Sequence, residues 1–513
     1  MKKHRYRSVR RHIPVRYILA GVISALEVCA IIGAVIACCY FIPHFYLLAW
    51  ATEIFCVVRI VASDDNPDYK VPWLVFVLIL PVVGFMLYFL FYSRKLQPKF
   101  VRRLKSLQNS GYQKDDSKLL EGLAEIDITA AGTAWMLCHT GATHLFVRTK
   151  ADYFASGREM WERMLSDLRE AGSFIYLSFF IIEEGVCWNS ILDILKQKVS
   201  EGVDVRVLYD DIGCMTTLPG NYARRLQKYG IRALPFSRLR GNADSEFNNR
   251  NHRKIAVIDG RVGYTGGMNL ADEYIGERIR FGHWKDAGLR LEGDAVWELT
   301  RLFLFDFGIS VKEMPQTQVE HYPAPTATDP DGYIIPFGDG PRPIYPRRVT
   351  KNLIIRMLSA ATRYVYITTP YLIIDNDICT ALENAALRGV KICITVPHIP
   401  DKKLVFLMTR SFYRRLTDSG IKIYEYTPGF IHAKCYLADG ESALVGTANL
   451  DYRSLVHHFE DGVWMYRTSC IRDIEADILT VMEKSRPIEK QTEKRSLRER
   501  FFSSLIRIFA PLM

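Results

Sequence analysis

The first hundred residues contain three apolar runs, and the rest of the chain alternates between polar and apolar positions. The runs cover residues 17–42, 45–62 and 71–92, and the third carries no charge. An apolar stretch of about 20 residues is long enough to cross a bilayer as a helix. The pattern therefore predicts an N-terminal membrane region, residues 1–95, with two or three apolar helices.

The charges that flank these runs leave the topology open. The basic residues are Lys2, Lys3, Arg5, Arg7, Arg10 and Arg11 before the first run, and Arg94, Lys95, Lys99, Arg102, Arg103 and Lys105 after the last. Positive charge favours the cytoplasmic side, so both ends are predicted there, which requires an even number of crossings. The second run contains Glu53 and Arg59 and could lie in the interface or re-enter. We expect the catalytic part to face the cytoplasm.

Strand and helix patterns then alternate, and their order repeats. Buried strands are predicted at residues 174–182 and 203–211, and strands at residues 364–372 and 390–397 take the same places in the second half. A helical pattern follows each strand. This order implies an internal duplication with largely parallel sheets covered by helices.

These patterns divide the chain into six segments. They are the membrane region 1–95, a juxtamembrane linker 96–151, a first catalytic domain 152–314, a linker 315–348 rich in Pro, Gly and Asp, a second catalytic domain 349–485, and a basic tail 486–513. Basic and apolar residues alternate at helical spacing in 496–513, which favours an amphipathic helix on an anionic surface over a helix docked on the domain. The basic cluster at 99–105 either binds anionic headgroups or only fixes topology.

A short motif occurs once in each half, and its repetition is the strongest chemical signal in the sequence. The copies comprise His252, Lys254, Asp259 and Asn269 in the first half, and His432, Lys434, Asp439 and Asn449 in the second. A single H-x-K-x4-D is expected by chance in roughly a few of every hundred chains of this length. Two copies, each followed by a turn of small residues and an Asn, are expected in fewer than about one in a thousand.

The motif suits phosphodiester chemistry. Side chains two apart on a strand share a face, so the His and Lys of each copy point the same way, and small-residue turns let backbone N–H groups approach an anion. One His can attack phosphorus while the other protonates the departing alkoxide, which requires opposite protonation states at the start. The Lys and Asn groups would offset charge on the phosphoryl oxygens. Asp259 and Asp439 complete the catalytic motif, although their place at strand ends favours capping of the following turn.

Composition narrows the class of partner. The chain has 513 residues, 49% hydrophobic content and a net charge of +11. It is too long for one ordinary domain, and the charge favours an anionic partner, either nucleic acid or lipid. Eleven cysteines include no C-x-x-C pair or zinc spacing, so we expect reduced thiols, no metal and no cofactor.

The duplicated motif resembles the signature of the phospholipase D superfamily, and further stretches resemble its bacterial cardiolipin synthase branch. These stretches are residues 208–213, 265–276, 283–296, 368–377 and 428–455. The resemblance implies an α/β fold with two tandem phospholipase D-like α/β/α units around one shared active site, preceded by N-terminal transmembrane helices. The family usually has two amino-terminal spans, which residues 45–92 match best.

The resemblance also implies an enzyme, a phosphatidyltransferase. It would transfer a phosphatidyl group from one phosphatidylglycerol to another through a phosphohistidine, with release of glycerol. In related enzymes the histidine of one motif is usually the nucleophile and that of the other is the acid and then the base. This implies that His252 is the nucleophile and His432 the acid and base, although the sequence itself does not distinguish the two. Acids placed like Asp286 and Glu460 accept a hydrogen bond from the catalytic His in relatives. The remaining histidines singled out, His139, His283, His457 and His458, are expected to be ordinary polar or packing residues.

Four other functions stay open at this point. A phospholipase D-type hydrolase or another phosphatidyltransferase would use the same residues. A nuclease-type phosphodiesterase would explain the basic charge, but the apolar helices and the lack of a stacking platform oppose it. A non-catalytic lipid-binding protein would be expected to carry a damaged motif, and both copies are intact. The expected partners are phosphatidylglycerol and the membrane, not nucleic acid; the expected location is the cell membrane, multi-pass, and the sequence does not give the oligomeric state.

Overall fold

The computed structural model describes residues 15–42, 45–63, 66–80, 83–89, 115–238, 249–311 and 329–489, together with residue 506. The basic N-terminus, the basic cluster at 99–105 and the predicted amphipathic tail, apart from residue 506, lie outside these ranges.

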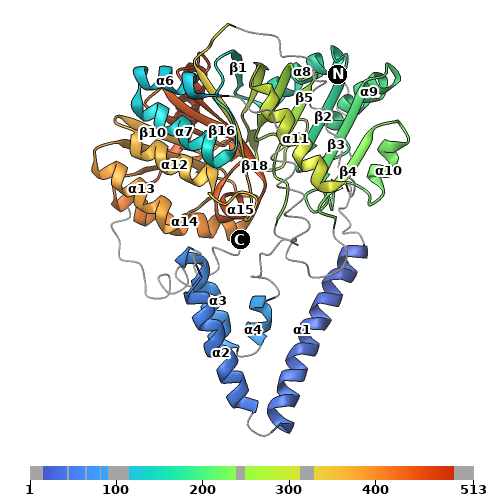
Figure 1. Ribbon diagram of the computed structural model, residues 1–513, viewed down its shortest axis with the longest axis vertical. Coiled ribbons are helices and arrows are strands. Elements are labelled where there is room, and N and C mark those ends of the chain that lie inside the picture. The colour runs from blue at the N-terminus through green and yellow to red at the C-terminus, as the bar shows by residue number, and fades with distance from the viewer. Residues whose placement is uncertain are drawn as a thin grey trace.

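Among the described residues before 115, four helices project from the catalytic part (Figure 1). They are α1 (Val15–Phe41), α2 (Phe45–Val61), α3 (Pro67–Ile79) and α4 (Val83–Leu87). The uncharged third run is thus divided between α3 and α4. The start of α3 is fixed by Asn66, whose side chain accepts the Asp68 N–H at 2.9 Å, and by Pro67 at the first position of the helix. Within the described ranges, no helix combines the length and apolar character of a membrane span.

The rest of the chain forms two large mixed sheets. The first has the strand order β1-β8-β6-β5-β2-β3-β4, and the second β19-β13-β12-β10-β15-β16-β18-β9. The first comprises β1 (Thr149–Phe154), β2 (Phe174–Phe179), β3 (Asp204–Asp210), β4 (Arg232–Phe236), β5 (Ile255–Ile258), β6 (Val262–Gly266) and β8 (Gly288–Gly293). The second comprises β9 (Tyr333–Asp339), β10 (Tyr364–Thr368), β12 (Lys391–Pro397), β13 (Lys422–Tyr426), β15 (Cys435–Ala438), β16 (Ser442–Gly446), β18 (Glu460–Tyr466) and β19 (Ser485–Pro487).

Only part of each sheet is parallel, which corrects the prediction of largely parallel sheets. Strands β2, β3 and β4 pair in parallel, as do β10, β12 and β13. The motif hairpins, β5–β6 and β15–β16, join them antiparallel. The reason is the short turn after each motif strand, because a few residues can connect antiparallel neighbours but cannot make the crossover that a parallel pair needs.

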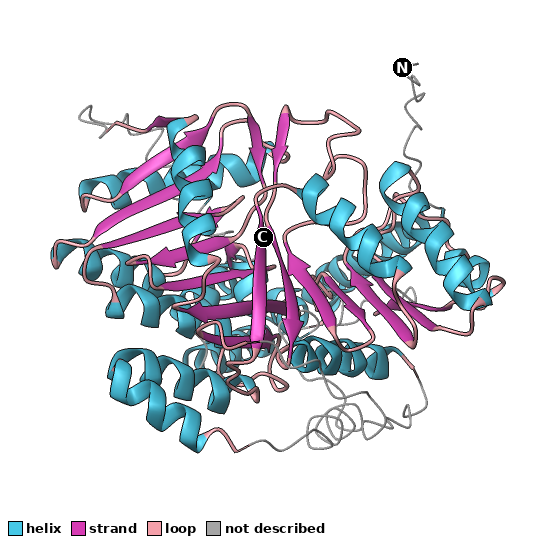
Figure 2. Ribbon diagram, turned by 90° about the horizontal axis from the view of Figure 1, so that it is seen from above, coloured by secondary structure: helices cyan, strands magenta, loops and turns pink. Residues whose placement is uncertain are grey.

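Helices cover the outer faces of both sheets (Figure 2). Around the first sheet they are α8 (Gly157–Arg169), α9 (Val186–Ser200), α10 (Tyr222–Gln227) and α11 (Val296–Ser310); around the second they are α12 (Val349–Ala360), α13 (Asn376–Leu387), α14 (Lys403–Asp418), α15 (Tyr452–Val456) and α16 (Ile471–Glu483). Two segments expected to be linkers also hold regular structure. The segment 96–151 contains α6 (Ser117–Ile126) and α7 (Ile128–Gly141), which lie beside the second half (Figure 1), and 315–348 contains β9 at the edge of the second sheet.

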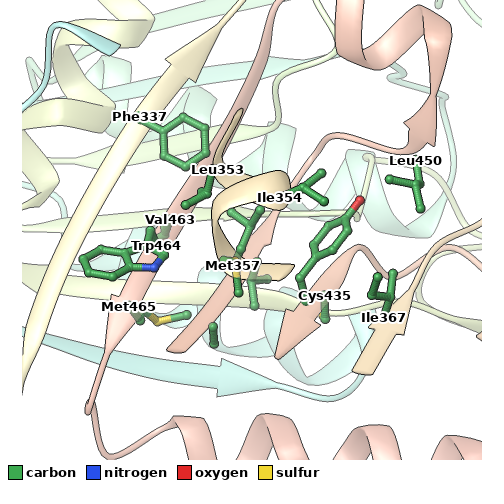
Figure 3. Packing of buried hydrophobic residues seen from close by; sticks show 14 of the residues in the cluster. Phe337, Leu353, Ile354, Met357, Ile367, Cys435, Leu450, Val463, Trp464 and Met465 are labelled. Carbon is green, nitrogen blue, oxygen red and sulfur yellow. The ribbon is translucent and has the colours of Figure 1, made fainter. Parts of the chain in front are cut away.

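One apolar core extends across both halves. It includes Phe174 and Leu289 of the first sheet as well as Phe337 and Trp464 of the second. Figure 3 shows the second-half part, where Phe337 and Trp464 lie close to Leu353 and Met357 of α12. Burial of these side chains from both sheets in a continuous cluster makes the two halves one folded body.

Strands and a buried arginine join the halves. Strand β7 (His283–Lys285) of the first half pairs in parallel with β14 (Gly429–Ile431) of the second. Arg253, from the first half, is fully buried; it donates to Asp306 Oδ1 at 2.7 Å, to the Glu460 carbonyl at 2.9 Å and to the Tyr345 hydroxyl at 2.9 Å. The guanidinium therefore neutralises a buried carboxylate and ties the segment 315–348 and strand β18 of the second half to the first motif.

Replacement of Arg253 by Met should lower the free energy of unfolding by about 3–5 kcal/mol, because it leaves Asp306 buried without its cation. The measurement is denaturant unfolding of the detergent-solubilised protein. Arg261→Met is the matched control, since Arg261 forms partly exposed ion pairs with Glu170 and Glu292, which contribute at most about 1 kcal/mol. Equal losses in the two variants would contradict the role assigned to Arg253.

Candidate active site

Each motif histidine is positioned by backbone contact with the opposite half. His252 and Lys254 directly precede β5, and the His252 N–H donates to the Phe459 carbonyl at 2.9 Å. His432 lies between β14 and β15, and its N–H donates to the Lys285 carbonyl at 2.7 Å. Both imidazoles are buried. The two motifs therefore meet at the interface between the halves.

The acids that hold the imidazoles are exchanged between the halves. His252 Nδ1 lies 2.9 Å from both carboxylate oxygens of Glu460, which belongs to the second half. His432 Nδ1 lies 2.8 Å from Asp286 Oδ2, which belongs to the first. Since a carboxylate accepts, each Nδ1 carries the proton, and each Nε2 is left for chemistry. The sequence indicated the orienting role of these acids but did not show that the pairs cross.

The two acids differ in their surroundings. Glu460 accepts the Thr447 hydroxyl at 2.5 Å, and burial raises the pKa of its carboxyl. Burial also opposes ionisation of Asp286, but the contact with His432 outweighs it and holds the Asp286 pKa below its usual value. Gly267 takes the place that Thr447 has in the other copy, and a Cβ there would lie 1.9 Å from Asp286 Oδ1. Glycine is therefore required beside Asp286, whereas the second copy uses this position to donate a hydroxyl.

Both imidazoles are neutral in the free protein. Burial lowers the pKa of His252 well below 6.5, and the ammonium groups of Lys254 and Lys434 lower it further. Burial and Lys434 lower the pKa of His432 to about 4, although Asp286 opposes the shift. A site that protonates a leaving group must therefore gain negative charge first, and a bound phosphodiester supplies it.

The motif lysines lie beside their histidines. Lys254 Nζ donates to the His252 carbonyl at 2.6 Å, and Lys434 Nζ donates to the His432 carbonyl at 2.5 Å. Burial lowers the pKa of Lys254 to about 8 and that of Lys434 to about 7. Their positive charge thus varies near neutral pH, unlike that of an exposed lysine.

The motif asparagines contact neighbouring loops. Asn269 accepts the Ile181 N–H at 3.0 Å and donates to the Tyr274 hydroxyl at 2.7 Å. Asn449 donates to Asp451 Oδ2 at 3.2 Å, and its Oδ1 is buried without a partner among the described residues. An amide nitrogen carries two donor hydrogens, so contact with a phosphoryl oxygen stays a prediction for both residues.

The motif aspartates lie at the far ends of β5 and β15 from the histidines. Asp259 accepts backbone N–H groups of residues 172–174 at 2.7–2.8 Å, and Asp439 accepts those of residues 362–364 at 2.7–2.8 Å. The carboxylates hold the segments that lead into β2 and β10, rather than capping the following turns. This corrects their place in the catalytic set, because these oxygens are already used by backbone donors away from the imidazoles.

His458 is the site residue that the sequence analysis missed. It is buried, its ring centroid lies 5.5 Å from that of His252, and its Nδ1 lies 3.8 Å from Glu460 Oε1. The sequence feature that could have indicated it is its place two residues before Glu460, since residues two apart in extended chain share a face.

Aromatic rings line the site around both imidazoles. The ring centroid of Phe180 lies 5.0 Å from that of His252, and those of Tyr274 and Trp284 each lie 5.5 Å from that of His432.

One group in the site has the composition of a metal site. His252, His458 and Glu460 each offer one ligand atom, and these atoms lie within 4.8 Å of one another. Two imidazoles and a carboxylate suit zinc. The Glu460 carboxylate already accepts the His252 Nδ1–H, however, so a metal would have to replace that hydrogen bond.

Comparisons with known proteins agree with this geometry. The family described as "Cardiolipin synthase, PLD-like domain" matches residues 164–278 and 354–482, and that described as "Phospholipase_D-nuclease N-terminal" matches residues 54–91. An uncharacterized protein of Streptococcus mutans is 41% identical over 466 residues, which are 89% of this chain and 99% of that protein. A cardiolipin synthase of Halalkalibacterium halodurans is 32% identical over 481 residues, 92% of this chain and 95% of that protein.

Solved structures support the fold. The crystal structure of a phosphatidylserine synthase from Haemophilus influenzae aligns with a TM-score of 0.55 at 15% sequence identity, covering 74% of this chain and 98% of that chain. At this identity the similarity concerns the fold alone, and it agrees with the two tandem α/β units.

The predicted superfamily and branch are confirmed by the family and sequence matches. The chain belongs to the cardiolipin synthase family of phospholipase D-like proteins.

Proposed function

We propose that this protein synthesises cardiolipin by transferring a phosphatidyl group from one phosphatidylglycerol to another, with release of glycerol. The observation that carries the proposal is the crossed pair of imidazoles, each with Nδ1 held by a buried acid and Nε2 left for reaction. Relatives named cardiolipin synthase, 32–33% identical over about 90% of this chain, support the same substrate class.

In the first step the lone pair of His252 Nε2 attacks phosphorus of one phosphatidylglycerol. With the phosphodiester bound, His432 is the imidazolium and carries a second proton, taken up from solvent, on Nε2. The bond from phosphorus to the glycerol oxygen breaks, and that oxygen takes this proton. Glycerol leaves, and the phosphatidyl group stays on His252. The positive charge that develops on this ring is offset by Glu460, which accepts its Nδ1–H.

In the second step the terminal hydroxyl of another phosphatidylglycerol attacks the same phosphorus. Its proton goes to His432, the bond from phosphorus to His252 Nε2 breaks, and both rings return to their starting states. One phosphodiester replaces another of similar energy, so the reaction needs no nucleotide. Water in place of the acceptor alcohol would make the protein a hydrolase.

The surroundings of the two acids support these roles. Asp286 is held ionised and accepts from His432, which favours the imidazolium that an acid needs once a phosphodiester is bound. His252 has a pKa well below 6.5 because it is buried beside two ammonium groups. It therefore stays neutral and keeps the Nε2 lone pair that a nucleophile needs.

We also propose that one rim of the catalytic part contacts an anionic bilayer. The rim consists of Ile399, Leu404 and Leu407, of which Leu404 is 48% and Leu407 55% exposed. Lys402 and Lys403 stand within it. Exposed apolar residues beside lysines suit a surface of anionic lipid.

The rim is connected to the site by aromatic side chains. Phe281, next to Arg280, lies 6.4 Å from Trp284, which flanks His432. Lys402 lies 5.9 Å from the centroid of the Tyr371 ring and adds to the positive potential at His252. Helix α14, which carries Leu404 and Leu407, lies on the side of the catalytic part from which α2 and α3 extend (Figure 1). With the basic residues that flank the apolar runs, this arrangement favours a cell-membrane protein whose catalytic part faces the cytoplasm.

Incubation of the purified protein with phosphatidylglycerol should give cardiolipin and glycerol, detected by mass spectrometry. His432→Ala should reduce cardiolipin formation about 100- to 10,000-fold, since it removes the general acid and base. His252→Ala should abolish both cardiolipin and any covalent lipid adduct. His139→Ala is the control, because that ring stacks on Trp135 outside the site. Phosphatidic acid as the main product would identify a hydrolase, and an adduct in His252→Ala would reverse the assignment of roles.

Affinity for phosphatidylglycerol should fall as pH rises from 7 to 9. Lys434 and Lys254 have pKa values of about 7 and 8, so raising the pH above these values removes the charges that hold the phosphodiester. KM should rise by up to about tenfold per pH unit for each charge lost. Lys434→Met should raise KM at pH 7 and flatten its increase, whereas the exposed Lys422→Met should match the parent. An unchanged KM profile in Lys434→Met would contradict this assignment.

Replacement of both Leu404 and Leu407 by Ser should raise the interfacial KM for phosphatidylglycerol in mixed micelles by roughly tenfold, since burial of part of a Leu side chain contributes about 1 kcal/mol. The kcat should stay near that of the parent because neither residue belongs to the site. Leu387→Ser, at a position that is 82% exposed on α13, is the control. Equal effects of the two changes would exclude the proposed rim.

A further inference from the structure

His458 is a buried imidazole close to His252. The residue is only 8% exposed, and neither Nδ1 nor Nε2 has a hydrogen-bond partner among the described residues. The 3.8 Å between Nδ1 and Glu460 Oε1 exceeds hydrogen-bond distance. A buried polar atom without a partner costs about 1–3 kcal/mol, so a bound group is expected to satisfy this ring.

The ring lies against the nucleophile. Its centroid is 5.5 Å from that of His252 and 6.5 Å from that of Phe180, which itself lies 5.0 Å from His252. The backbone fixes this placement, because the His458 N–H donates to the Arg453 carbonyl at 3.0 Å and the adjacent Phe459 carbonyl accepts the His252 N–H at 2.9 Å. A group held by His458 would therefore stand beside the phosphorus that His252 attacks.

The hydrogen-bonding groups of the His458 ring determine which kind of ligand group it can bind. The ring is buried and its nearest carboxylate oxygen lies beyond hydrogen-bond distance, so the neutral form of His458 is favoured. A neutral imidazole has one N–H donor and one lone-pair acceptor. A phosphoryl oxygen only accepts and would satisfy the donor alone. A hydroxyl both donates and accepts, and neighbouring hydroxyls of a polyol would satisfy both nitrogens.

We propose that His458 binds the secondary hydroxyl of the glycerol headgroup and thereby selects a polyol as the acceptor of the phosphatidyl group. This inference rests on the proposed synthase activity and adds the residue that distinguishes glycerol from water or a simple alcohol. The terminal hydroxyl of the same headgroup would then lie near phosphorus, where it gives its proton to His432. His458 binds substrate in this scheme but transfers no proton.

The test is the choice of acceptor by the full-length enzyme. The parent, His458→Phe and His458→Gln would each receive phosphatidylglycerol with added glycerol, 1-propanol or neither, and the lipid products would be counted by mass spectrometry. Phe keeps a flat ring but removes both nitrogens, so we expect the preference for glycerol over 1-propanol to fall about 10- to 100-fold, with more phosphatidic acid. Gln keeps a donor and an acceptor, so His458→Gln should retain part of the preference.

His457→Phe provides the matched control. His457 is the adjacent histidine, and its ring lies 6.0 Å from that of Tyr69, on the side of the second half that meets α3. This change should leave acceptor preference unchanged. Thermal unfolding of each variant shows whether it is folded, and His458→Gln keeps the inference testable if His458→Phe does not fold.

The outcomes separate this inference from the proposed function. If the parent transfers no phosphatidyl group, the synthase activity itself fails. If the parent makes cardiolipin and folded His458→Phe keeps the preference of the parent, only the role of His458 is overturned. Zinc titration monitored by calorimetry tests whether His252, His458 and Glu460 bind a metal ion instead. Loss of zinc binding in His458→Phe with unchanged acceptor preference would also overturn the hydroxyl-binding role.

Discussion

The exchange of acids between the halves is the interaction on which the rest of the site depends. His252 is held by Glu460, 208 residues away, and His432 by Asp286, 146 residues away. Neither half alone contains a motif histidine together with the acid that holds it. The parallel pairing of β7 with β14 and the buried Arg253 are therefore part of the chemistry, since they set the register in which each acid reaches its ring.

Two identical half-sites would give both imidazoles the same surroundings, whereas the proposed reaction gives the two rings different roles. Both rings are neutral in the free protein, and the structure distinguishes them through small differences around their acids. Thr447 donates to Glu460, whereas Gly267 makes room for Asp286, and the pKa values of the two carboxyls are displaced in opposite directions. The repeat thus supplies the geometry, and local substitutions supply the division of roles.

Burial governs how this site responds to its substrate. Two lysines and three histidines share a region with little access to water, so every cationic form is disfavoured and the imidazoles are neutral in the free protein. A bound phosphodiester would place a negative charge beside these lysines and histidines and would favour their cationic forms. Under the proposed function, binding of the phosphodiester would favour the imidazolium of His432, and catalysis would depend on occupancy of the site.

The amino-acid sequence alone is enough to identify the duplicated motif, the order of strands in each half and the two motif histidines, and the resemblance to relatives indicated Asp286 and Glu460 as their acids. These features are local: periodicity identifies a strand, and spacing identifies the residues that share its face. The tertiary structure decided the crossing of the acids, the structural role of Asp259 and Asp439, the mixed sheets, and the presence of His458 in the site. Each of these depends on which distant segments meet when the halves close, and contacts across a hundred or more residues leave no periodic trace in the chain.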